Sequence, residues 1–156
     1  MSTAANDPDL AWMHAALALA ERAQRDGEVP VAAIVVRDGA IIGQGWNRNR
    51  ASNDCSAHAE IEALREAGRK LQNHRLLGCT LYCTLEPCVM CVGALVHARV
   101  ARLVYAAAEP KTGACESAFE LLPHPGHNHY IEVRAGLMRN QAHALLRDFF
   151  QQKRCA

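Results

Sequence analysis

Two cysteines that follow a proline are the residues of this sequence whose types and spacing most clearly indicate chemistry. Cys88 and Cys91 stand three positions apart after Pro87, and the preceding residues 79–85 form an apolar, β-branched run typical of a buried strand. Pro87 suits the first position of a helix. The two thiols would then share one face of the first helical turn, where the positive end of the helix dipole favours thiolates. Such a pair predicts a divalent metal site.

A histidine further back in the chain supplies a third ligand. His58 and Glu60 lie in the first turn of a helix expected at 57–70. Helices that follow parallel strands begin at the carboxyl edge of the sheet, so His58 is expected to meet the cysteines there. Three protein ligands leave the fourth tetrahedral position to water, and zinc lowers the pKa of that water to near neutral. Glu60 points about 200° around the helix from His58, which suits a proton carrier rather than a ligand.

A structural zinc site is the alternative to a catalytic one. It would need a fourth protein ligand, and Cys55, Cys83 or a histidine of the loop at 124–129 are the candidates. Cys83 belongs to the expected strand, and no second closely spaced cysteine pair could complete the set. The sequence therefore favours the catalytic arrangement.

Hydrophobic periodicity and turn residues divide the chain into alternating helices and strands. Helices are expected at 7–25, 57–70, 87–99 and 137–154, with a short one at 117–122; strands are expected at 29–36, 40–46, 79–85, 100–108 and 130–134. Asp38-Gly39 joins the first two strands and is a hairpin signal, so these strands are expected to be antiparallel. The polar segments 47–56 and 124–129 are expected to be loops.

Individual residues of the first and last helices carry further expectations. Asp7 or Asp9 is expected to cap the first helix. The last helix is expected to have an apolar side formed by Leu145, Leu146, Phe149 and Phe150.

The alternation of strands and helices after residue 40 predicts parallel strands with right-handed crossovers. Combined with the hairpin, it predicts an α/β fold: a three-layer α/β/α sandwich around a five-stranded mixed sheet. The chain has 156 residues, 50% of them hydrophobic and 21% charged, which fits a single domain over 1–156. No internal repeat or linker interrupts it.

Charge and cysteine content limit the cellular context. The formal net charge of +1 neither indicates nor excludes a nucleic-acid partner. No apolar run approaches the roughly twenty residues of a membrane span, and residues 1–7 lack the features of a secretory signal. The seven cysteines then read as reduced thiols and metal ligands, which predicts a cytoplasmic protein without a membrane partner.

The metal-site motifs resemble those of the zinc-dependent cytidine/deoxycytidylate deaminase superfamily, which carries His-x-Glu followed by Pro-Cys-x-x-Cys. Further stretches resemble the bacterial tRNA-specific adenosine deaminases within it, and together they span nearly the whole chain. These stretches are Glu28-Val29-Pro30-Val31, Gly45-Trp46-Asn47-Arg48, Ala57-His58-Ala59-Glu60-Ile61, Thr84–Cys91, Lys111-Thr112-Gly113-Ala114, His124-Pro125-Gly126, Asn128-His129 and Asp148-Phe149-Phe150.

The resemblance implies a cytidine-deaminase-like fold and a role for each matched residue. It makes His58, Cys88 and Cys91 the ligands of one zinc ion per subunit and Glu60 the proton shuttle. It implies that Asn47 and Asn128 contact a flipped nucleotide and that Lys111 helps to hold RNA. Glu109 stands where the family commonly has aspartate, so the carboxylate that would contact the nucleotide is one methylene longer.

The reaction implied by the resemblance is hydrolytic deamination of adenosine to inosine at the wobble position of an arginine tRNA anticodon. Zinc-bound hydroxide would attack C6, Glu60 would carry the protons, and ammonia would leave. The implied partners are the tRNA anticodon stem-loop and a second copy of the chain, with the 87–99 helix at the dimer surface.

Two other functions are compatible with the same residues. One is deamination of a free base or nucleotide, such as guanine, cytosine or a pterin precursor. The other is a non-catalytic, zinc-scaffolded RNA-binding subunit, which the presence of Glu60 disfavours.

Outside the motifs, ordinary structural interpretations compete with functional ones. Asn47 has the residue type of a cap, and Glu109 and Lys111 that of a solvated turn. His124, His127 and His129 are expected to form a surface loop. Five basic residues form a candidate phosphate-binding rim, namely Arg48, Arg50, Lys111, Lys153 and Arg154. Cys55, Cys79, Cys115 and Cys155 are expected to be packing or surface thiols.

Overall fold

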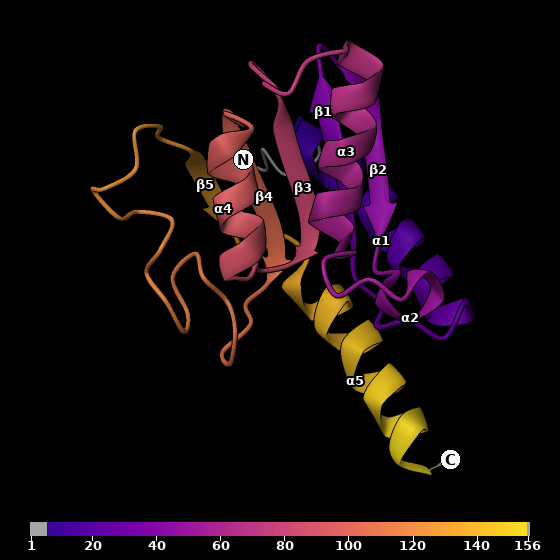
Figure 1. The fold of residues 1–156 in the computed structure, drawn as a ribbon. Helices are drawn as coiled ribbons and strands as arrows, with labels where there is room; N and C mark the ends of the chain where they lie inside the picture. Colours follow the sequence, from indigo (N-terminus) through magenta and orange to yellow (C-terminus); the bar gives the residue numbers. More distant parts are fainter. Residues whose placement is uncertain (1–5, 156) are drawn as a thin grey trace.

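A five-stranded sheet with helices on both faces forms the domain (Figure 1). The computed structural model describes residues 6–155. The strands are β1 (Ala32–Arg37), β2 (Ala40–Trp46), β3 (Thr80–Leu85), β4 (Arg102–Ala107) and β5 (Glu132–Ala135). The helices are α1 (Pro8–Arg25), α2 (Asn49–Ser52), α3 (Ala59–Leu71), α4 (Val89–His97) and α5 (Arg139–Cys155).

The strand order is β2-β1-β3-β4-β5. β1 pairs antiparallel with both β2 and β3, whereas β3–β4 and β4–β5 are parallel pairs. Four strands therefore run in one direction and β1 runs against them, which confirms the expected hairpin and mixed sheet. β1 also separates β2 from β3, so α3 crosses over one strand before the chain re-enters the sheet.

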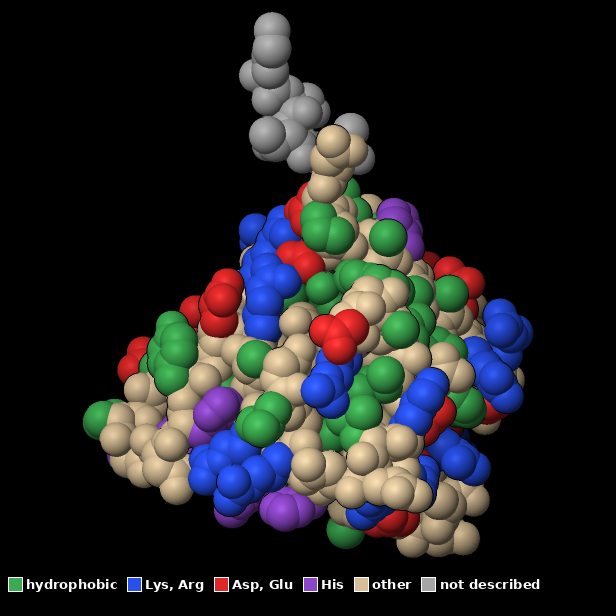
Figure 2. Space-filling view, turned by 90° about the horizontal axis from the view of Figure 1, so that it is seen from above, with side chains coloured by type: hydrophobic (Ala, Val, Ile, Leu, Met, Phe, Trp, Pro, Cys, Tyr) green, Lys and Arg blue, Asp and Glu red, His purple; other side chains and the backbone are tan. Residues whose placement is uncertain are grey.

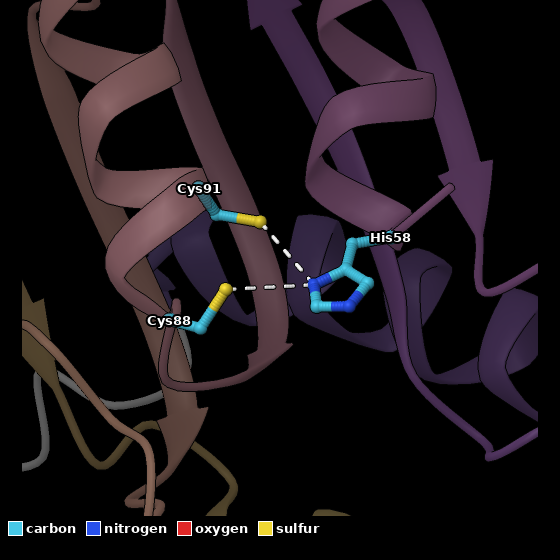
Figure 3. Close-up of side chains that lie close together, drawn as sticks. All are labelled: His58, Cys88 and Cys91. Carbon is cyan, nitrogen blue, oxygen red and sulfur yellow. Dashed lines mark hydrogen bonds between the residues drawn. The ribbon is translucent and has the colours of Figure 1, made fainter. Parts of the chain in front are cut away.

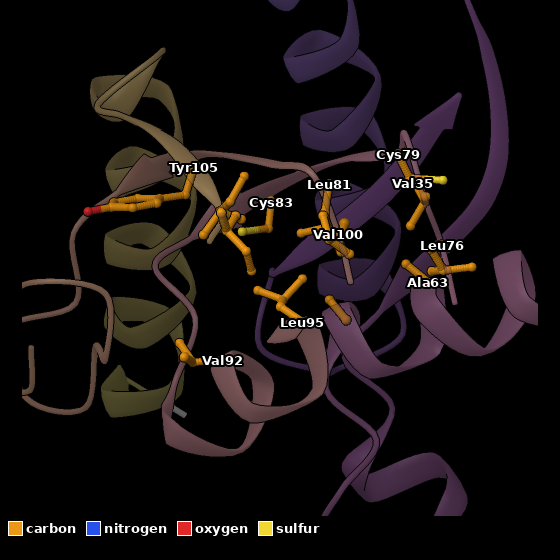
Figure 4. Packing of buried hydrophobic residues seen from close by; sticks show 14 of the residues in the cluster. Val35, Ala63, Leu76, Cys79, Leu81, Cys83, Val92, Leu95, Val100 and Tyr105 are labelled. Carbon is orange, nitrogen blue, oxygen red and sulfur yellow. The ribbon is translucent and has the colours of Figure 1, made fainter. Parts of the chain in front are cut away.

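Alternate residues of the central strands point to opposite faces and build two cores. Val35, Leu81 and Leu103 pack beneath α3 and α4, as Figure 4 shows for members of this cluster. Ile34 and Val104 face the other way and pack against α1 and α5. The three-layer α/β/α sandwich predicted from the sequence is confirmed.

Helix α3 lies unusually close to strand β2 because two glycines face it. A Cβ on Gly45 would stand 2.5 Å from the carbonyl oxygen of Ala59, and one on Gly43 would stand 2.4 Å from that of Ala63. Any other residue at these positions would push the helix away. The first turn of α3, which carries Glu60, is thus held directly against the sheet.

Two short segments differ from the sequence prediction. The expected loop at 47–56 contains the single-turn helix α2. The helix expected at 117–122 does not form, because its N–H groups reach back along the chain. Ala118 and Phe119 donate to the Gly113 carbonyl, while Leu121 and Leu122 donate to that of Ala114. The loop expected at 124–129 is confirmed as irregular.

The structure also tests the expectations for single residues of α1 and α5. Asp7 is the N-cap of α1 and accepts a hydrogen bond from the N–H of Asp9. Asp9 is not a cap: its carboxylate is buried and binds Tyr82, Arg102 and Arg134. On α5 the expected apolar side is narrower than predicted. Phe149 is buried whereas Phe150 is 47% exposed, because the helix extends beyond the sheet (Figure 1).

Basic and acidic side chains mix with hydrophobic ones on the end of the molecule shown in Figure 2, where neither charge dominates. This end is opposite the starts of α3 and α4 (Figure 1). Within residues 6–155, no helix has the length and apolarity that a membrane crossing requires.

Candidate metal centre and active site

His58, Cys88 and Cys91 converge at the carboxyl edge of the sheet (Figure 3). Nδ1 of His58 lies 3.5 Å from Sγ of Cys88 and 3.6 Å from Sγ of Cys91. All three ligand atoms lie within 4.8 Å of one another, and in the described part of the chain no other group of histidine, cysteine or acidic residues meets this criterion. The structure therefore brings together the three residues that the sequence predicted as ligands.

Helix starts position these side chains, although both helices begin two residues later than predicted. His58 and Cys88 are the N-caps of α3 and α4, so neither stands inside a first turn, and Pro87 precedes its helix. The cap residues keep extended backbone and direct their side chains across the helix ends. Cys91, inside the first turn of α4, completes the group.

Asn47 fixes the start of α3. Its Oδ1 accepts a hydrogen bond from the N–H of Ala59 at 2.9 Å, which satisfies one of the free donors of the helix terminus. Asn47 therefore acts as a cap, in agreement with its residue type, and lies beside the predicted ligand His58. Its side-chain amide N–H groups remain available for a substrate.

The pKa values of the two cysteines are shifted in opposite directions. Hydrogen bonding from Cys91, against the effect of burial, and from His58 lowers the pKa of Cys88 to about 3. The same contact with Cys88, together with burial, raises the pKa of Cys91. Contact with Cys88 also raises the pKa of His58, against the effect of burial. A cation bound here would displace the thiol protons, because a metal deprotonates a coordinating thiol.

Glu60 is buried directly behind this group and is only 4% exposed. Its Oε2 lies 3.1 Å from Sγ of Cys91, and burial raises its pKa. A carboxyl group with a raised pKa, next to a metal site, is suited to carry protons.

Several of the residues considered as a fourth zinc ligand make hydrogen bonds away from the metal cluster. Sγ of Cys83 is directed to the carbonyl of Leu85, away from the candidate metal group. In the loop, His127 and His129 bind the carbonyls of Leu121 and Val100. These contacts argue against a fourth protein ligand and a structural zinc site. Cys79 and Cys115 are buried packing thiols, and Cys55 and Cys155 are exposed.

The other predicted substrate residues are only partly brought to this site. Glu109 and Lys111 lie in the turn that follows β4, where the Glu109 carboxylate accepts the N–H of Lys111 at 2.9 Å. Asn128 binds Arg99 at 2.6 Å, just beyond the C-terminal end of α4, whereas Cys88 is at its start. Within one chain Asn128 is therefore not close to the metal group.

Glu86 is a residue to which the sequence analysis gave no role. Its carboxylate is buried, and burial opposes its charge, but hydrogen bonds from Ser117 and from backbone N–H groups hold its pKa below the usual value. The sequence contains one indication of a role for Glu86, namely that a charged residue stands between an apolar strand and the metal-binding motif.

Comparison with known proteins agrees with this site. Residues 6–107 match the family described as the cytidine and deoxycytidylate deaminase zinc-binding region, so the chain is a zinc-dependent deaminase of that family. It is 46% identical over 147 residues to the tRNA-specific adenosine deaminase of Haemophilus influenzae, covering 94% of this chain and 85% of the relative. Within the superfamily, the chain belongs to the family of these adenosine deaminases.

Solved structures share the fold. One comes from a study of A-to-I editing by tRNA:A34 deaminases at the wobble position of transfer RNA; it matches with a TM-score of 0.84 and 42% identity over 86% of this chain and 98% of that one. A guanine deaminase from Nitrosomonas europaea matches with a TM-score of 0.75 and 35% identity over 92% of this chain and 84% of that one. The cytidine-deaminase-like fold and the zinc cofactor expected from the sequence are confirmed.

Proposed function

We propose that this enzyme converts adenosine to inosine at the wobble position of an arginine tRNA anticodon. The observation that carries the proposal is the buried Glu60 carboxyl group beside the His58, Cys88 and Cys91 cluster, in a chain 46% identical to a tRNA-specific adenosine deaminase. The overall reaction consumes water and releases ammonia.

The protein residues divide the chemistry between them. His58, Cys88 and Cys91 would hold zinc, which supplies Lewis-acid activation of a water molecule when bound. The Glu60 carboxylate would carry one proton from a water molecule to the adenine ring nitrogen, and then a second proton, from the hydroxyl group added at C6, to the departing amine. Burial raises the pKa of Glu60, which suits a group that both accepts and releases a proton.

Substrate recognition is assigned to residues around the carboxyl edge. Asn47 would donate from its side-chain amide to the flipped nucleotide, since its oxygen is already bound to Ala59. Glu109 and Lys111 would contact ribose and phosphate from the turn after β4. The outer part of α5 projects past the sheet at this end (Figure 1), and its exposed Lys153 and Arg154 would meet the anticodon stem.

Self-association supports the same function in our proposal. An apolar groove of about 640 Å³ lies between α3 and α4 and is lined by Ile61, Leu64 and Ala94, among others. A second copy packing on this groove would give a homodimer, and Asn128 would then reach a nucleotide only through the assembled surface. We place the enzyme in the cytoplasm, where tRNA is its substrate.

Deamination of free guanine is the second candidate, and the 35% identity with the Nitrosomonas europaea guanine deaminase favours it over other free-base reactions. Both reactions would use the metal cluster and Glu60. They would differ in the protein groups that surround the substrate base.

A substrate panel separates the candidates. Purified zinc-loaded enzyme is incubated with an arginine-anticodon stem-loop RNA, the same stem-loop with guanosine at the wobble position, free adenosine, guanine and cytidine. We expect inosine at the wobble position of the first RNA only. Release of ammonia from guanine with an unmodified stem-loop would refute the tRNA assignment, and size-exclusion chromatography with light scattering tests the dimer.

A further inference from the structure

One buried carboxylate connects the metal-binding segment to the turn that carries Glu109 and Lys111. Glu86 is 3% exposed and immediately precedes Pro87 and the ligand Cys88. The segment 109–117 wraps around it, and the Ala114 N–H also donates to the Pro87 carbonyl at 2.8 Å.

The Glu86 carboxylate receives hydrogen bonds from both ends of this segment. Oε1 accepts the N–H of Glu109 at 3.1 Å and the hydroxyl of Ser117. Oε2 accepts three successive backbone N–H groups at 3.0–3.1 Å, those of Cys115, Glu116 and Ser117. All these donors point from the segment towards Glu86, so without the carboxylate the N–H groups would lose their acceptor, and that of Cys115 would lose it in a buried position.

Gly113 lets the segment approach this closely. A Cβ at Gly113 would stand 2.5 Å from Cδ of Glu86 and 2.5 Å from the carbonyl oxygen of Glu109. No side chain larger than hydrogen fits while the carboxylate keeps its place. Glycine and glutamate therefore form one packing unit between the turn and the metal-binding segment.

We propose that Glu86 is a positioning residue for deamination. Its carboxylate fixes the 109–117 segment to the junction that carries Cys88, and so sets where Glu109 and Lys111 meet the substrate relative to the metal centre. The proposal rests on the proposed function for the substrate roles of Glu109 and Lys111; the structural part rests only on the hydrogen bonds to Glu86.

A carboxylate is required because it only accepts, whereas an amide both accepts and donates. In Glu86→Gln, the single oxygen can take the place of Oε2 and keep the three bonds from residues 115–117. The amide nitrogen then faces the N–H of Glu109, and that bond is lost. The substitution is therefore expected to release the Glu109 end of the segment while it leaves the other end and the metal ligands in place.

The test compares full-length Glu86→Gln and Gly113→Ala with the wild type, with Glu120→Gln as the control, because Glu120 is an exposed acidic residue close to the segment. Three quantities are measured: zinc per chain, amide hydrogen exchange of peptides covering 109–117, and kcat and KM with the stem-loop RNA. In both variants we expect wild-type zinc content, about tenfold faster exchange at the Glu109 end, and a KM raised about tenfold with kcat changed far less. The control should match the wild type.

Two kinds of result would contradict the positioning role of Glu86. Unchanged exchange and unchanged KM in Glu86→Gln would overturn it, and so would loss of zinc or an equal fall in kcat, since these would make Glu86 part of the metal centre. If Glu86→Gln does not fold, Gly113→Ala carries the same measurements and the same criteria. If the wild-type enzyme leaves the stem-loop unmodified, the proposed function fails, but the exchange measurement still decides whether Glu86 holds the segment.

Discussion

Replacing Asp9 by asparagine tests how α1 is attached to the sheet. The Asp9 carboxylate accepts four hydrogen bonds of 2.7–2.8 Å: one from the Tyr82 hydroxyl, two from Arg102 and one from Arg134. These donors come from β3, β4 and β5, while Asp9 lies in the first turn of α1. Asparagine keeps the shape but removes the buried counter-charge that Arg102 and Arg134 share, so that Arg102 keeps only the exposed Glu132 and Arg134 only Asp7 as ion-pair partners.

The expected loss in the free energy of unfolding follows from how deeply Asp9 and its two arginine partners are buried. Removing one partner of a fully buried ion pair costs about 3–5 kcal/mol. The Asp9 side chain is only 5% exposed, but those of Arg102 and Arg134 are 26% and 39% exposed, so water replaces part of what they lose. We therefore expect Asp9→Asn to lower the free energy of unfolding by about 2–3 kcal/mol at pH 7, and the melting temperature by about 5–10 °C.

The pH dependence gives a second check with a definite sign. Hydrogen bonding from Arg102, against the effect of burial, holds the pKa of Asp9 well below its usual range. The unfolded chain therefore takes up the proton first, near pH 3.9, and the stabilisation is complete above about pH 5 and lost as the pH falls. The difference between wild type and Asp9→Asn should be about 1 kcal/mol smaller at pH 3 than at pH 7.

Urea unfolding of metal-free samples, followed by circular dichroism at both pH values, measures these differences, because the histidine and cysteine ligands would release zinc at pH 3. Asp148→Asn is the control, because Asp148 is an exposed acidic residue of α5, and it should lie within about 0.5 kcal/mol of the wild type. A cost below about 0.5 kcal/mol for Asp9→Asn, or a cost that does not change with pH, would refute the reasoning.

Substitutions at four further positions test the metal centre and its supports. Cys88→Ser should weaken zinc binding at least about a hundredfold, measured by competition with a chromogenic chelator. Gly45→Ala should cost about 1–3 kcal/mol in urea unfolding and reduce activity because it displaces Ala59, whereas Gly43→Ala, further from the site, should cost as much and keep more activity. Asn47→Ala should lose about 1 kcal/mol of stability, whereas Asn47→Asp should keep that stability but lose activity with RNA, because the aspartate caps without donating. Equal stability of the two Asn47 variants would contradict the capping role.

The sequence was sufficient for the metal centre because its spacing and the topology constrain each other. Cys88 and Cys91 are close in sequence, whereas His58 is 30 residues before Cys88. The strands β2 and β3, which precede α3 and α4, both run against β1 and therefore bring the two helix starts to one edge. The error of two residues at each start arose because the cap residue and the one before it keep non-helical backbone while resembling helical residues in sequence.

The segment after β4 could not be predicted in the same way. Its residues 117–122 have a pattern compatible with a helix, but the N–H of Ser117 binds Glu86, which is about 30 residues away in the chain. Four of the N–H groups that follow bind the carbonyls of Gly113 and Ala114. Likewise, Asp9 looked like a cap because its partners Arg102 and Arg134 are distant in sequence. Long-range polar contacts leave little periodic signal.

The central claim is that Glu60 transfers protons during deamination at the metal centre. The most direct measurement is inosine formation in the arginine-anticodon stem-loop by wild type and Glu60→Gln, with zinc content determined on the same samples. We predict full zinc content in both proteins and a rate of inosine formation at least about a hundredfold lower in Glu60→Gln. Inosine formation by Glu60→Gln at the wild-type rate would contradict the account.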